Sequence, residues 1–450
     1  MNSICSKNLK YEDCELAILR SAVDNVEEKT GKEKINSPEI KKIIKIVEEF
    51  ISNKKLICYG GTAINNILPK KDQFYNKEIE IPDYDFFSMK PLEHAKELAD
   101  IYFKKGFQEV EAKAGMHYGT YKVFVNFIPV ADITLLHKDI FSSIRKDAIK
   151  VNKILYTPPD YLRMSMYLEL SRPQGDVSRW EKVLKRLSLL NKNYPLISKS
   201  CKNIEIQRGM ESNNNDDVYE DLKDILIKEQ VVFFGGFANS LYTKYMPKHL
   251  QKRFEKFPDF DVLSENPEKT AKNIENKLTK LGYDKIKIVM HDNVGEIIAK
   301  HYEVLINGET VCFIYEPLAC HSYNVFKLNN KTLKIATIDT MLSFYLAFIY
   351  SKRPYFDKNR ILCMSKYLFI VQQKNRLSQK GLLKRFSINC YGKQPTMETM
   401  RAEKAEKYNE LKDKRGTREY EEWFLKYTPK NKVKTHKKNK SKKNKTVKKK

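Results

Sequence analysis

Residues 56–62, LICYGGT, form an apolar run that ends in two glycines and a threonine. The run predicts a strand, and residues 62–68 after it predict a short helix. Gly60 and Gly61 have no Cβ, so a phosphate can approach their backbone closely. A helix that begins there directs free N–H groups and a partial positive charge at that phosphate. The stretch therefore predicts a phosphate-binding loop, with Thr62 as an additional hydroxyl donor.

Three acidic residues follow the loop. Residues 82–87 read PDYDFF, and Asp83 and Asp85 are two positions apart, so on a strand they share a face. Asp132 lies in a second apolar run, residues 128–134, where burial of an unpartnered carboxylate would be costly. Carboxylates on adjacent strands form a hard oxygen site that suits Mg²⁺, and two such ions support in-line nucleotidyl transfer. All three are thus predicted to be catalytic metal ligands.

The same pattern returns later in the chain. Residues 231–236, VVFFGG, and 258–262, PDFDV, repeat the double glycine and the paired acids. A third block, YEVLIN at 302–307, matches YKVFVN at 121–126. Matched blocks in one order predict an internal duplication of about 180 residues, with two copies of one α/β unit.

The third acid distinguishes the two copies. An offset of 181 residues puts Phe313 where the first copy has Asp132. Without a third carboxylate, a two-metal site has too few ligands to position a nucleophilic oxygen. The first copy is therefore the predicted catalyst. The second is predicted to be a scaffold or a surface that grips nucleic acid.

Composition and periodicity divide the chain into five segments. These are a helical N-terminal element at 1–35, the first copy at 36–205, the second at 218–373, a basic extension at 374–429 and a disordered Lys-rich tail at 430–450. Residues 211–217 contain no apolar residue, so they predict the linker. Ser37 and Pro38 predict the start of a helix, and residues 421–427 are expected to dock back on the body.

Charge and cysteine content limit the class of protein. The chain has 83 Lys and Arg against 57 Asp and Glu, a net charge of +26. Such a surplus favours a polyanionic partner, most simply nucleic acid; a solvated Lys-rich surface is the alternative. The eight cysteines form no zinc spacing, and their scatter favours a reducing compartment. The most apolar window, 341–350, is too short to span a bilayer, so no membrane partner is expected.

The order of these elements resembles the nucleotidyltransferase superfamily of polymerase-beta type. Its motif positions fall on Gly60, Gly61, Asp83, Asp85 and Asp132, and Thr62 stands where Ser is common. More narrowly, the chain resembles the catalytic subunits of viral poly(A) polymerases from poxviruses and giant cytoplasmic DNA viruses. Those proteins carry a catalytic domain followed by a degenerate copy of the same fold, which matches the duplication.

This resemblance implies an α/β (α+β) fold of two tandem nucleotidyltransferase domains, the second degenerate. It implies template-independent addition of AMP from ATP to an RNA 3′ end, with two Mg²⁺ or Mn²⁺ ions and release of pyrophosphate. A homodimer or a viral processivity partner is implied, in the host cytoplasm (viral factory) or the virion. Two alternatives stay open: another RNA nucleotidyltransferase of the superfamily, such as a CCA-adding enzyme, and an inactive RNA-binding scaffold.

Overall fold

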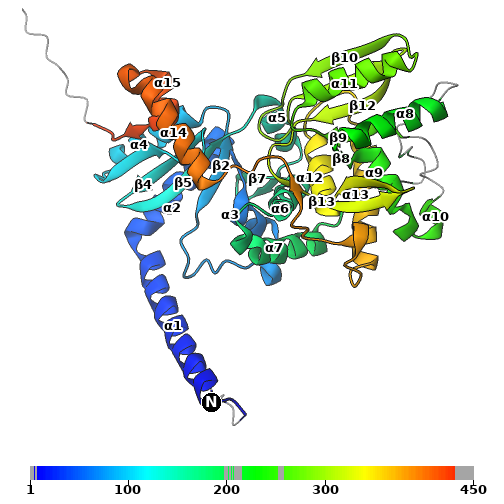
Figure 1. The fold of residues 1–450 in the computed structure, drawn as a ribbon. Coiled ribbons are helices and arrows are strands. Elements are labelled where there is room, and N and C mark those ends of the chain that lie inside the picture. The colour runs from blue at the N-terminus through cyan, green and yellow to red at the C-terminus, as the bar shows by residue number, and fades with distance from the viewer. Residues whose placement is uncertain are drawn as a thin grey trace, which may run out of the picture.

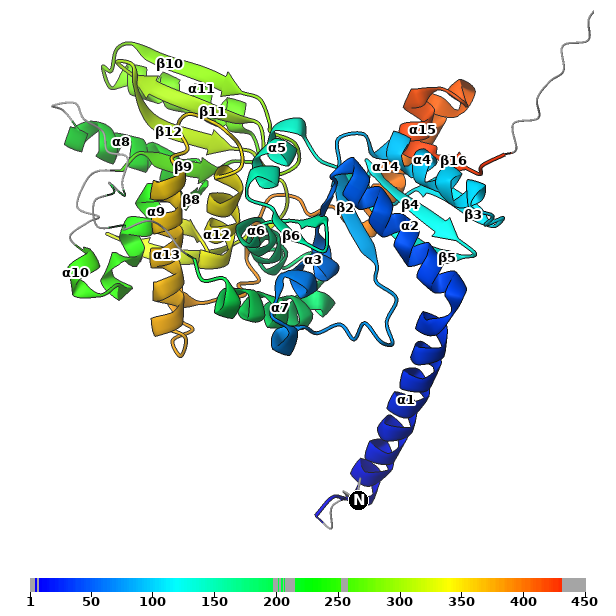
Figure 2. The same ribbon diagram turned by 180° about the vertical axis from the view of Figure 1, so that it is seen from behind.

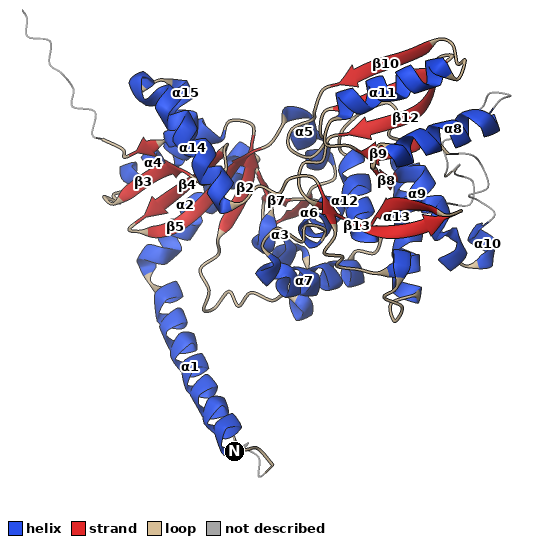
Figure 3. Cartoon of the chain, viewed as in Figure 1, coloured by secondary structure: helices blue, strands red, loops and turns tan. Residues whose placement is uncertain are grey.

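The computed structural model describes residues 5, 8–196, 201, 204, 206, 215–251 and 258–430. Two eight-stranded sheets lie next to one another, with helices between and around them (Figure 1). Figure 3 shows the same mixture of helices and strands along the whole described chain. The predicted disordered tail, residues 430–450, lies outside the described residues except for Lys430.

The first sheet has the strand order β16–β3–β4–β5–β2–β1–β7–β6. Its strands are β1 (Ile57–Cys58), β2 (Tyr84–Ser88), β3 (Val110–Ala114), β4 (Thr120–Val125), β5 (Ile128–Leu135), β6 (Ile149–Val151), β7 (Ile154–Tyr156) and β16 (Lys426–Tyr427). The helices of this copy are α2 (Pro38–Lys54), α3 (Gly60–Ile67), α4 (Pro91–Lys104), α5 (Lys138–Lys146), α6 (Pro159–Leu170) and α7 (Trp180–Asn193).

The second sheet has the order β10–β11–β12–β9–β8–β14–β13–β15. Its strands are β8 (Val232–Phe234), β9 (Phe260–Leu263), β10 (Ile286–His291), β11 (His301–Ile306), β12 (Glu309–Tyr315), β13 (His321–Leu328), β14 (Lys331–Ala336) and β15 (Cys390–Tyr391). Its helices are α8 (Asn215–Lys228), α9 (Gly235–Tyr242), α10 (Lys248–Gln251), α11 (Pro267–Lys280), α12 (Ile338–Phe348) and α13 (Lys358–Lys374).

The two strand orders are the same once one added edge strand is removed from each. In both copies a short strand pairs antiparallel with the strand that carries Asp85 or Asp261, and parallel with the second strand of a hairpin. The predicted duplication and fold class are thereby confirmed. One expectation needs correction: residues 215–217, assigned to the linker, already belong to α8, and residues 211–214 lie outside the described residues.

The start of α2 also differs in detail from the prediction. Ser37 occupies the position before the helix and Pro38 opens it, but the Ser37 side chain makes no capping hydrogen bond. Before it, α1 (Tyr11–Asn36) extends the predicted N-terminal helix and has no buried residue. Figure 2 shows this helix projecting away from both sheets. No described helix is long and apolar enough to cross a membrane.

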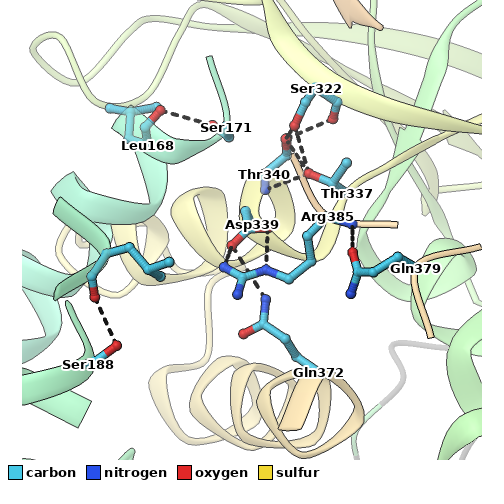
Figure 4. Close-up of polar contacts among 11 residues, drawn as sticks. Leu168, Ser171, Ser188, Ser322, Thr337, Asp339, Thr340, Gln372, Gln379 and Arg385 are labelled. Atoms are coloured by element: carbon cyan, nitrogen blue, oxygen red, sulfur yellow. Dashed lines mark hydrogen bonds and ion pairs between the residues drawn. The ribbon is translucent and has the colours of Figure 1, made fainter. Parts of the chain in front are cut away.

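The two copies are joined by packing of α6 against α12, and Figure 4 shows the polar contacts nearby. Asp160 and Asp339 lie in the first turns of these two helices. Asp339 is 1% exposed and accepts a hydrogen bond from Arg385 at 2.7 Å. Ser322 donates its backbone N–H to the carbonyl of Ser171 at 2.8 Å, so β13 is tied directly to the end of α6.

The C-terminal extension adds one strand to each sheet instead of forming a separate domain. Strand β15 pairs with β13 in the second sheet, and β16 pairs with β3 in the first. Between them run α14 (Met397–Leu411) and α15 (Arg418–Phe424). The expected docking of residues 421–427 on the body is confirmed, and the extension spans the two copies.

Six of the eight cysteines are paired in the structure. The disulfides join Cys5 to Cys14, Cys201 to Cys363 and Cys320 to Cys390. The scattered cysteines favoured a reducing compartment, in which such pairs are uncommon. The last two pairs join residues 162 and 70 positions apart, which no sequence motif marks.

Candidate active site

The double glycine lies at the end of β1, where α3 begins. Gly60 has φ +70°, a conformation that side chains rarely tolerate, and a Cβ there would lie 2.6 Å from Oδ2 of Asp85. The backbone N–H of Tyr59 donates to the carbonyl of Asp85 at 2.9 Å. The glycine therefore brings the predicted phosphate loop directly against one of the predicted acids.

Thr62 has a structural bond that the sequence did not indicate. Its hydroxyl donates to the carbonyl oxygen of Asp83 at 2.6 Å, and the residue is buried. This bond ties the first turn of α3 to the residue just before β2. Asp83 thus precedes the strand instead of lying on it, because β2 begins at Tyr84.

Strand pairing brings two of the acids into register. Strands β2 and β5 are parallel neighbours, and Asp85 lies opposite Asp132. On the other side of β5, Lys122 of β4 lies opposite Asp132, and its ammonium forms an ion pair with Oδ2 of that residue. Sequence reasoning missed Lys122, because only the antiparallel register of β4 and β5 puts it beside the acid.

The three acids form one electrostatic group. Burial and then the negative charges of Asp83 and Asp132 together raise the pKa of Asp85 to about 7. Burial and then the charge of Asp132 also raise the pKa of Asp83, while Lys122 lowers it. Carboxylates that resist ionisation beside one another gain from a cation between them. In this respect the donor set fits a divalent ion.

The acids are not assembled as a compact cluster. Among the residues that the structure describes, no three His, Cys, Asp or Glu side chains come together closely enough to hold a metal ion. The Lys122 ammonium supplies the positive charge at Asp132 instead. The assignment of Asp83, Asp85 and Asp132 as metal ligands therefore stays a prediction, and Lys122 would have to release Asp132 to an incoming ion.

In the second copy, a buried aromatic residue occupies the position that Asp132 has in the first. Asp261 on β9 lies opposite Phe313 on β12, the same register that joins Asp85 to Asp132. Phe313 is fully buried, with its ring centroid 5.0 Å from that of Tyr355. Asp259 is only 3% exposed. The register confirms that Phe313 replaces Asp132, and an apolar ring fills the place of the third acid.

Two residues that sequence reasoning missed lie over the phosphate loop. A Cβ at Gly61 would overlap the hydroxyl of Tyr75 and would lie 2.9 Å from Nη1 of Arg186. Arg186 donates from Nη2 to the Tyr75 hydroxyl at 2.8 Å. With Lys182 and Lys185 of the same helix, these residues line a cavity of about 470 Å³. Helix α7 therefore adds positive charge beside Gly61.

Comparison with known proteins agrees with this geometry. Residues 45–176 match the model of the family described as poly(A) polymerase catalytic subunit. The chain resembles viral poly(A) polymerase catalytic subunits. The matched segment contains the loop and all three acids, but it ends before α7 and the second copy.

Individual relatives support the same assignment. A protein of African swine fever virus (strain Badajoz 1971 Vero-adapted), assigned as a poly(A) polymerase catalytic subunit, is 39% identical over 171 residues, 37% of this chain and 36% of the relative. The chain thus spans about a third of that relative's length. A protein of Acanthamoeba polyphaga mimivirus with the same assignment is 24% identical over 397 residues, 78% of this chain and 67% of the relative.

A solved structure extends the likeness to both copies. The crystal structure of the Megavirus polyadenylate synthase superposes with a TM-score of 0.77 at 20% sequence identity. The superposition covers 94% of this chain and 87% of that chain. The two proteins therefore share the fold, including the second copy that the family match does not reach.

Proposed function

We propose that this protein is a polynucleotide adenylyltransferase that adds AMP from ATP to RNA 3′ ends without a template. The observation that carries the proposal is the pairing of Asp85 with Asp132 beside the Gly60 turn, in the first copy only. The match of residues 45–176 to the poly(A) polymerase family supports it. The basic composition suits an RNA substrate.

In this proposal each part of the site has one task. The triphosphate of ATP lies at Gly60, Gly61 and the first turn of α3, with Arg186 as a charged neighbour. Divalent ions, when bound, neutralise the triphosphate and lower the pKa of the RNA 3′-hydroxyl. Asp83 and Asp85 would hold both ions, and Asp132 would help to hold the ion beside the RNA 3′-hydroxyl. The new bond joins O3′ to the α-phosphorus, and pyrophosphate leaves.

Primer extension with each of the four NTPs tests the proposal. An unlabelled RNA primer should be extended with ATP in the presence of Mg²⁺ or Mn²⁺. Equal use of CTP would favour the alternative, another RNA nucleotidyltransferase. Lack of extension with either ion would favour an inactive RNA-binding scaffold.

The proposal includes partners and a location. RNA and ATP are the substrates, and the enzyme acts in the host cytoplasm, in the viral factory, or in the virion. It works as a homodimer or with a viral processivity factor. The mass of the purified protein, measured with and without RNA, distinguishes a dimer from a monomer that needs another subunit.

The pH dependence of stability should reveal the acidic group. The folded Asp85 has a pKa of about 7 against an ordinary value of 3.8, so between these values the folded state holds more protons than the unfolded one. Stability of the metal-free protein should therefore fall as pH rises from about 4 to about 7. Mg²⁺ or Mn²⁺ binds the ionised form, so its stabilisation should be larger at pH 8 than at pH 6.

Unfolding transitions measured from pH 5 to pH 8, with and without the ion, check this expectation. Asp85→Asn should flatten both the pH dependence and the effect of the ion. Asp139→Asn, an exposed carboxylate at the start of α5, is the matched control and should change neither. Equal stabilisation by the ion in wild type and Asp85→Asn would contradict a metal at this site.

Arg186→Ala should weaken ATP binding. The side chain lies beside Gly61, and a hydrogen bond from a charged donor contributes about 1.5–3 kcal/mol, so KM for ATP should rise by at least about tenfold. KM for RNA should stay unchanged. Lys192→Ala is the control on the same helix, since Lys192 pairs with Asp72 and does not line the cavity of Arg186. An unchanged KM for ATP would remove Arg186 from the site.

A further inference from the structure

A second cavity lies on the Asp132 side of the catalytic sheet. Its volume is about 420 Å³. It is lined by Tyr59, Met116, His117, Tyr118, Thr120, Asp132, Thr134, Glu296, Pro395, Met400, Glu403, Lys404 and Trp423. Gly60, Gly61 and Arg186 do not line this cavity. Arg186 lines the cavity described above. Asp132 is the one of the three predicted acids that lines this second cavity, and none of the three lines the Arg186 cavity.

The C-terminal extension builds one wall of this cleft. Figure 1 shows α14 and α15 beside β4 and β5. The rings of Tyr118 and Trp423 have centroids 4.7 Å apart with a tilt of 39°. Tyr118 is 43% exposed, and Trp423 is half-buried. An aromatic pair with accessible surface thus faces a cavity that Asp132 also lines.

Several contacts hold this wall in place. Strand β16 pairs with β3, and the N–H of Ala114 donates to the carbonyl of Leu425 at 2.9 Å. The Tyr121 hydroxyl donates to the carbonyl of Glu422, the neighbour of Trp423, at 3.0 Å. Lys404 of α14 donates to the carbonyl of Gly115 at 2.6 Å. The indole is therefore fixed relative to the catalytic sheet before any substrate arrives.

We propose that this cleft receives the 3′-terminal nucleoside of the RNA, with its base against Trp423 and Tyr118. The inference rests on the proposed function and names the position of the RNA end. Aromatic rings stack on any base, which suits an enzyme that must accept both a transcript end and its own adenylate product. The hydroxyls of Thr120 and Thr134, which also line the cleft, suit the ribose. The 3′-hydroxyl then faces Asp132, and ATP enters from the Arg186 side.

Tryptophan fluorescence tests the binding without turnover. The chain has two tryptophans, Trp180 and Trp423. Trp180→Phe leaves Trp423 as the reporter, and titration with a short oligoadenylate should quench its emission. Trp423→Phe leaves Trp180, which lies on α7 beside Phe386, and its emission should stay constant. Quenching of Trp180 alone would overturn the proposal.

Kinetics separate RNA binding from ATP binding. Trp423→Ala should raise KM for the RNA by about tenfold or more, because the base loses the aromatic ring on which it stacks. KM for ATP should stay unchanged. Trp423→Phe should restore most of the loss. Phe424→Ala is the matched control, since Phe424 packs on Tyr408 and Tyr420 outside the cleft. A rise in KM for ATP instead of RNA would overturn the proposal.

The proposed function can fail separately. If wild-type protein extends RNA but Trp423→Ala has an unchanged KM and Trp423 is not quenched, the inference about the cleft is wrong and the adenylyltransferase assignment stands. If wild-type protein extends no RNA while oligoadenylate still quenches Trp423, the cleft binds RNA in a protein that lacks the proposed activity.

Discussion

Asp132→Asn is expected to reduce AMP addition by about 1,000-fold, the upper end of the loss when one preorganised electrostatic group is removed. Asp132 lies opposite Asp85 in the sheet, and its counterpart in the second copy is Phe313. Asn keeps the shape of the side chain but removes the charge that would hold a metal beside the RNA hydroxyl. RNA binding, read from Trp423 fluorescence, should persist. Single-turnover primer extension under saturating ATP measures the loss.

Asp261→Asn is the matched control for this experiment. Asp261 occupies in the second copy the position that Asp85 occupies in the first. Activity per folded molecule should stay within about twofold of wild type, once the folded fraction is measured by thermal unfolding. Full activity in Asp132→Asn would show that the acid set is wrongly assigned. Loss of activity in a folded Asp261→Asn would show that the second copy takes part in catalysis.

The sequence predicted this difference between the two copies because repeated motifs and the spacing between them reveal it. A strand, a double glycine and two acids can be recognised wherever they recur, and an offset of 181 residues was enough to align Phe313 with Asp132. The register of β9 with β12 confirms that alignment. Loop positions and the order of elements were therefore predictable from local patterns.

Other parts of the site depend on contacts between distant segments. Lys122 reaches Asp132 only through the pairing of β4 with β5. Arg186 lies 125 residues after Gly61, and Trp423 is 291 residues after Asp132. No periodicity connects such residues, because a packed helix or an added edge strand can come from anywhere in the chain. The local pattern of each segment does not show which other segment it packs against.

Conservation of the double glycine in both copies has a structural explanation. Gly60 and Gly235 have φ values of +70° and +67°, and a Cβ at either would collide with the acid on the neighbouring strand. The turn between β1 and α3 thus needs glycine for backbone geometry in the first copy, and the turn between β8 and α9 needs it in the second. The glycine pair is common to both copies, and the third acid is present only in the copy that is predicted to be the catalyst.

Gly60→Ala and Gly235→Ala should therefore both destabilise the fold, but only Gly60→Ala should slow the reaction. Each forces a side chain into the left-handed region, which should lower the free energy of unfolding by about 1–2 kcal/mol or more. In the first copy the new Cβ also lies 2.6 Å from Oδ2 of Asp85, so the carboxylate must move. A displacement of about 1 Å can cost about 100-fold in rate, and this is the loss expected for Gly60→Ala.

Chemical unfolding and primer extension on the same preparations check both expectations. Gly235→Ala should lose at least as much stability as Gly60→Ala, because its Cβ would lie closer to Asp261 than a Cβ at Gly60 lies to Asp85, but its rate per folded molecule should equal that of wild type. The stability readout controls for damage to the fold, so the difference in rate isolates the phosphate loop. Equal rates in the two variants would mean that the Gly60 turn does not position Asp85 for catalysis. Loss of activity in both variants would mean that the turn between β8 and α9 also contributes to the reaction.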